Sequence, residues 1–83
     1  MKDLITHVGI EIQTKTADMA YQIAQKFNDE HLGGKLKTII ADEVAYQTFW
    51  VTLAETEEMA AAKHQEYLQT YVDFLKELSR QLQ

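Results

Sequence analysis

Residues 56–83 read TEEMAAAKHQEYLQTYVDFLKELSRQLQ and have the apolar spacing of one continuous helix. The apolar stripe runs to the last turn and includes Leu68, Tyr71, Leu75, Leu78 and Leu82. A helix of this length measures about 40 Å, whereas a compact domain of this size is only about 30 Å wide. We therefore expect a single domain, 1–83, from which residues 75–83 project as a helix end that needs a covering surface.

The start of this helix carries its own signals. Thr56 is suited to cap it, and Glu57 and Glu58 follow in the first turn, where the helix dipole favours acidic groups. Further upstream, residues 17–31 predict a shorter helix. Thr14 or Thr16 would cap that helix, and Gly33-Gly34 would end it, because glycine adopts left-handed backbone conformations without steric cost.

Three segments have the composition of strands: 5–13, 35–41 and 44–53. The first alternates apolar and polar residues, and the third is the richest in β-branched and aromatic residues. Asp42-Glu43 predicts the turn between the second and third segments. We expect Phe49, Val51 and Leu53 to face the helices.

The element order is β-α-β-β-α, which predicts an α+β fold with a three-stranded antiparallel sheet in the order 1-3-2. Two helices are expected on one face of this sheet, so that each buries its stripe. The architecture resembles the split β-α-β pattern of ferredoxin-like folds without the last strand. The missing strand would leave the edge of the first strand unpaired, unless a loop or the N-terminal residues shield it.

The chain has 83 residues, of which 46% are hydrophobic and 25% charged, a composition typical of a small globular domain. It has no cysteine, which excludes disulfides, thiolate metal sites and a cysteine nucleophile. The N-terminal residues lack the apolar core of a signal peptide, and no apolar run reaches the roughly 20 residues that span a bilayer. We expect a cytoplasmic location.

The net charge of −5, with Arg80 the single arginine, disfavours direct binding to nucleic acids or to an anionic membrane. Five acidic residues are expected at one end of the domain, together with Asp3. They are Asp29, Glu30, Glu55, Glu57 and Glu58. They indicate either a docking surface for a basic partner or helix-end electrostatics combined with solubility.

The residues that could carry chemistry are scattered. His7, His31 and His64 lie on three different elements and have no metal-ligand spacing. Gly33-Gly34-Lys35 follows a helix and precedes a strand, the reverse of the order in a phosphate-binding loop. We expect no metal, no cofactor and no enzymatic activity.

Two aromatic residues on the third strand, Tyr46 and Trp50, are expected on the sheet face that points away from the helices. His7 and Glu11 of the first strand would lie beside them. Large aromatic residues on an open face are typical of an interface or a pocket, although isolated surface aromatics also occur.

Three functional hypotheses follow. The first is a non-catalytic interaction module, a homodimer that associates through Tyr71, Leu75, Leu78 and Leu82 or through Tyr46 and Trp50. The second is an acidic inhibitor or decoy, of phage or mobile-element type, that occupies a basic groove of a nucleic-acid-binding protein. The third is a ligand-binding subunit with a pocket between the two sheets of a dimer.

Overall fold

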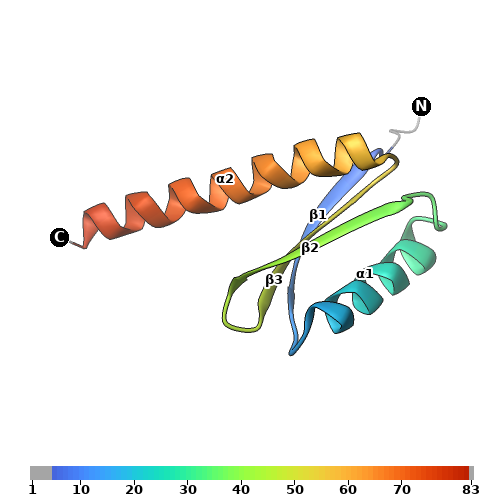
Figure 1. Cartoon of the computed structure of the whole chain (residues 1–83), viewed down its shortest axis with the longest axis horizontal. Helices are drawn as coiled ribbons and strands as arrows, with labels where there is room; N and C mark the ends of the chain where they lie inside the picture. The colour runs from blue at the N-terminus through green and yellow to red at the C-terminus, as the bar shows by residue number, and fades with distance from the viewer. Residues whose placement is uncertain (1–4, 83) are drawn as a thin grey trace.

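The computed structural model describes residues 5–82 and has five elements in the predicted order. They are β1 (His7–Gln13), α1 (Ala17–His31), β2 (Thr38–Ala45), β3 (Thr48–Ala54) and α2 (Glu57–Gln81). The strands form one antiparallel sheet in the order β1-β3-β2, which confirms the predicted class and strand order. The molecule measures 46 × 32 × 22 Å, with α2 as its longest element (Figure 1). Asp3 and Gln83 lie outside the described residues.

Both helices begin, and α1 ends, where local chemistry predicts. The Thr16 hydroxyl accepts the backbone N–H of Met19 at 3.2 Å, and the Thr56 hydroxyl accepts that of Met59 at 3.1 Å. These bonds satisfy donors that a helix start leaves without partners. Gly33 and Gly34, with φ of 66° and 69°, turn the chain out of α1.

The helices lie on opposite faces of the sheet (Figure 1), so the prediction that both pack on one face is wrong. One face, the α1 face, buries apolar residues of all three strands against α1. It includes Val8, Ile10, Ile12, Ile39, Ala41, Phe49, Val51 and Leu53. The alternate residues point to α2, and no Cα atom of α1 lies within 8 Å of one in α2 among the described residues. The ferredoxin-like arrangement therefore does not describe this chain.

A buried histidine explains the choice of face. His64 lies on the sheet-facing side of α2 and is only 4% exposed, so both of its ring nitrogens need partners within the protein. Thr52 and Asp42 provide those partners at 2.8 and 2.6 Å. Both belong to the sheet face opposite Val51 and Leu53. Packing on the α1 face would have placed the imidazole against aliphatic side chains.

The hairpin turn lies later than predicted. It is formed by Tyr46 and Gln47, not by Asp42-Glu43, and β2 accordingly runs to Ala45. Gln47 adopts a φ of 57°, and its N–H donates to the Glu43 carboxylate at 2.9 Å. The sequence has no glycine at the turn, so this side-chain bond compensates for the missing turn residue.

The inner face of α1 is made of small residues and one amide. Ala20, Ala24 and Asn28 are buried. The Asn28 side chain donates to the carbonyl of Leu36 at 2.7 Å and accepts its N–H at 3.3 Å. These two bonds tie the end of α1 to the segment that leads into β2.

Candidate functional site

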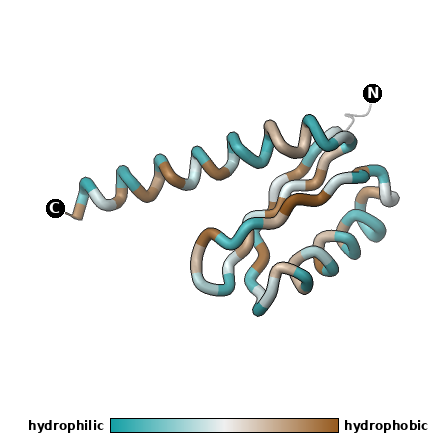
Figure 2. Tube along the Cα trace, viewed as in Figure 1, coloured by the Kyte–Doolittle hydropathy of each residue, from teal (hydrophilic) through white to brown (hydrophobic). Residues whose placement is uncertain are grey.

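The C-terminal half of α2 extends past the sheet (Figure 1). Every residue from 72 to 82 is exposed, although hydrophobic positions recur to the end of the helix (Figure 2). Phe74 is 60% exposed and Leu82 is 80% exposed. An exposed apolar row of this kind is typical of a surface that another molecule covers.

The exposed row continues the side of α2 that packs on the sheet. Ala60, His64 and the half-buried Tyr67 face the strands. At about 100° per residue, the same side of the helix is reached again by four later residues. These four, the terminal stripe, are Phe74, Leu75, Leu78 and Leu82. Tyr71, which is half-buried, lies between the covered and the uncovered part.

The residues that flank the row of leucines within the terminal stripe carry no charge. Leu68, Tyr71, Leu75, Leu78 and Leu82 alternate in steps of three and four, as at the seam of paired helices. Val72, Ser79 and Gln81 occupy the remaining flanking positions together with Phe74. The charged residues point elsewhere on the helix, and Glu77 and Arg80 pair with each other.

The structure does not bring Tyr46 and Trp50 onto one open face. Tyr46 lies in the hairpin turn and is 86% exposed, whereas Trp50 is covered by α2. The rings of Trp50 and Tyr67 meet edge to face with their centroids 5.5 Å apart. His7 lies beneath the same tyrosine, and Glu11 is exposed. α2 therefore occupies the sheet face on which a pocket between two sheets was expected.

A different cavity, of about 570 Å³, lies between α2 and the β1 side of the sheet. We call it the indole cavity. It is lined by Gly9, Trp50, Tyr67, Thr70, Tyr71 and Phe74. The indole Nε1 of Trp50 is buried and has no hydrogen-bond partner. A side chain at Gly9 would not fit, because its Cβ would lie 2.6 Å from a ring carbon of Tyr67.

A hydrogen-bonded network runs from the Thr52 hydroxyl through the His64 imidazole to the Asp42 carboxylate. A carboxylate only accepts hydrogen bonds, so Nε2 of His64 donates to Asp42, and Nδ1 forms the second bond of the ring with the Thr52 hydroxyl. Acyl-transfer enzymes use this order, but they expose the hydroxyl to substrate. Thr52 is 0% exposed, so this network holds α2 on the sheet and offers no nucleophile to a substrate.

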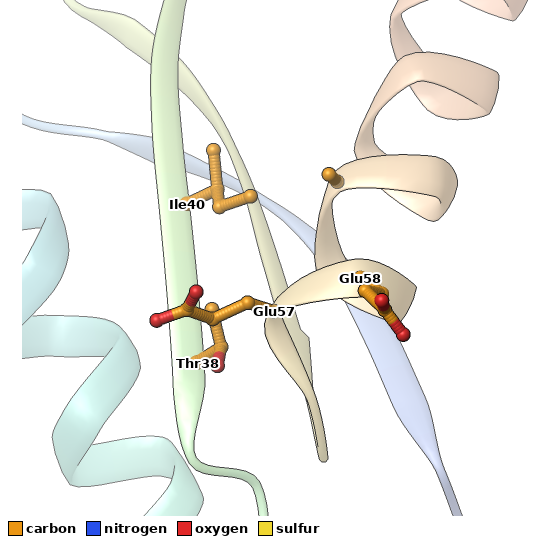
Figure 3. Close-up of a pocket in the computed structure, with 5 residues that line it drawn as sticks. Thr38, Ile40, Glu57 and Glu58 are labelled. Carbon is orange, nitrogen blue, oxygen red and sulfur yellow. The ribbon is translucent and has the colours of Figure 1, made fainter.

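The five predicted acidic residues are all exposed and lie toward one end of the sheet. Glu57 and Glu58, with Thr38, Ile40 and Ala61, line a groove at the edge of β2. Figure 3 shows the carboxylate of Glu57 beside Thr38, whereas Glu58 points away from the strand. Lys26, 4.0 Å from Glu30, adds positive charge to this end of the molecule.

Within residues 5–82, no group of three or more histidine and acidic side chains is placed to hold a metal ion. None of the described helices is long and apolar enough to cross a membrane. Comparisons of the chain with protein-family models, curated proteins and solved structures found no match.

Proposed function

We propose that this protein is a non-catalytic interaction module that forms a homodimer through the terminal stripe of α2. The observation that carries the proposal is the continuation of the sheet-packing side of α2 beyond the sheet, where Leu75, Leu78 and Leu82 are exposed. Burying such side chains contributes about 1.5–3 kcal/mol each, and association is the means by which a projecting helix achieves it.

A second copy of this chain suits the stripe better than a charged partner does. Seams that select a different partner helix usually carry charged residues at the flanking positions. Here those positions are Val72, Phe74, Ser79 and Gln81, so two identical helices meet without repulsion between like charges. The flanking Val72 and Phe74 also widen the apolar surface that the two copies share.

The acidic end of the molecule supports the decoy hypothesis less well. Its carboxylates are distributed over the ends of both helices, which lie on opposite faces of the sheet. Lys35 and Lys37 are exposed in the segment between α1 and β2, at the same end as Glu57. The surface is therefore of mixed charge, whereas a molecule that occupies a basic groove needs a continuous acidic one.

Sedimentation velocity across a range of micromolar concentrations tests the dimer. We expect the wild-type chain, of 9.6 kDa, to sediment with twice that mass. Leu75→Glu combined with Leu78→Glu should give a monomer with unchanged circular dichroism, because neither side chain contacts the sheet. Buried like charges at both positions would disfavour association by several kcal/mol.

Lys76→Glu combined with Glu77→Lys is the matched control, since it alters the neighbouring positions of the same helix and keeps the net charge. This variant should remain a dimer. A wild-type chain that stays monomeric at high micromolar concentration would overturn the proposal.

A further inference from the structure

The indole cavity has the size and composition of a binding site for a small molecule. Its volume of about 570 Å³ falls within the range of roughly 300–1,000 Å³ that such pockets occupy. Four of its lining residues are aromatic: Trp50, Tyr67, Tyr71 and Phe74. Gly9 has no side chain, so the ring of Tyr67 packs directly on the strand backbone beside the cavity.

The lining selects an uncharged molecule. No charged side chain contributes to it, and a charged ligand would lose its hydration without gaining an ionic partner. The polar groups are the hydroxyls of Tyr67, Tyr71 and Thr70. The Thr70 hydroxyl donates to the carbonyl of Glu66 at 2.9 Å, so its oxygen offers only an acceptor to the cavity. Aromatic walls favour planar rings through stacked and edge-to-face contacts.

The one polar group without a partner is the N–H of Trp50. An indole nitrogen is only a donor, and burying a donor without an acceptor costs about 1–3 kcal/mol. In the free protein this nitrogen has no contact with solvent. A ligand atom in the cavity can accept this N–H only after the indole ring shifts, so binding would be coupled to a movement of Trp50.

We propose that the indole cavity binds a neutral, planar aromatic molecule carrying a hydrogen-bond acceptor, which accepts the N–H of Trp50. Stacking on the tyrosine and phenylalanine rings supplies the affinity. The bond to the indole supplies the selectivity, because it satisfies a donor that the protein alone leaves unpaired. All its lining residues belong to one copy, but Tyr71 and Phe74 also lie in the surface proposed for the homodimer, so the site is complete in the monomer and a second copy would cover part of it.

Nuclear magnetic resonance tests this proposal directly, because Trp50 is the only tryptophan and gives a single indole N–H signal. The probe is quinoline, which is planar and neutral and has a ring-nitrogen acceptor. We expect quinoline to shift the indole signal downfield in a saturable manner. Naphthalene, which has the same shape without the acceptor, should bind at least about tenfold more weakly, the effect of roughly 1.4 kcal/mol.

Two variants locate the site. Phe74→Ala removes a wall of the cavity at an exposed helix position, where the fold is retained, and should weaken quinoline binding several-fold. Lys76→Ala, on the same helix but outside the cavity, should leave binding unchanged. The proposal is overturned if quinoline produces no saturable shift up to its solubility limit, if naphthalene binds equally well, or if Phe74→Ala binds like the wild type.

Discussion

His64 and Thr52 form a buried hydrogen bond of 2.8 Å between the imidazole Nδ1 and the hydroxyl oxygen. Both residues are almost completely shielded from solvent, and they belong to different layers, α2 and the sheet. The bond therefore fixes the position and orientation of α2 over β3. β3 has threonines on one side and apolar residues on the other. The apolar side packs against α1, and the bond to His64 explains why the threonine side carries α2.

Replacing His64 by leucine should lower the free energy of unfolding by about 1–3 kcal/mol, because the Thr52 hydroxyl would be left buried without its partner. Replacing both residues, His64→Leu with Thr52→Val, should recover part of this loss, since no unpaired polar group remains. Urea denaturation of the wild type, both single variants and the double variant gives the coupling energy. Strictly additive losses would show that the two side chains do not interact.

Asp42→Asn provides the control for the outer part of this network. The Asp42 side chain is 57% exposed, and the asparagine carbonyl can still accept from Nε2 of His64. Exposed ionic contacts contribute at most about 1 kcal/mol, so this variant should be close to the wild type in the same denaturation experiment.

Local chemistry predicted much of the fold. The helix caps at Thr16 and Thr56 and the stop at Gly33-Gly34 depend on short-range rules and were confirmed. The strand order, which was also confirmed, follows from the order of the elements along the chain. The face on which α2 packs could not be predicted from hydrophobic pattern alone, because β3 is buried on both sides. The available signal was His64: a polar residue on the inner stripe of a helix requires polar partners, and only the Thr52 side of β3 offers them.

The misplaced turn had a further consequence for the site. With Asp42 assigned to a turn, its bond to His64 could not be foreseen, and Tyr46 and Trp50 seemed to share one strand face. The indole cavity was beyond sequence analysis for a related reason. Gly9, Trp50 and Tyr67 come from three elements, and they meet only because α2 lies on the face opposite to the one expected.

Gly9→Ala should destabilise the protein by about 1–3 kcal/mol through overpacking. The added Cβ would lie 2.6 Å from Cε2 and 2.9 Å from Cζ of Tyr67, so the tyrosine ring would have to shift. Combining Gly9→Ala with Tyr67→Leu should cost less than the sum of the two single changes, because the smaller side chain makes room. Thermal unfolding of the four proteins measures this coupling. If the losses simply add, the close approach of Tyr67 to Gly9 is not what limits residue 9.

Gln47→Gly should raise the free energy of unfolding by about 0.5–1 kcal/mol. Gln47 has a φ of 57°, and among the described residues it is the only non-glycine residue with positive φ. Glycine adopts this conformation without the steric cost that a Cβ atom brings. The backbone N–H that donates to Glu43 would be retained. Tyr46→Gly, at the neighbouring turn position without positive φ, is the control and should not stabilise the protein in the same urea titration.

Deleting residues 76–83 should leave the free energy of unfolding of the monomer within about 0.5 kcal/mol of its value in the full chain, because residues 76–82 are all exposed and lie beyond the sheet. A deeper deletion, of residues 68–83, also removes the half-buried Leu68 and Tyr71 and should cost about 2 kcal/mol or more. Denaturation of dilute samples compares the two, and sedimentation of the shorter deletion should show that association is lost. If removing 76–83 destabilises the dilute monomer as much as the deeper deletion does, then the terminal leucines are buried within a single copy, and the stripe is not a surface for a second one.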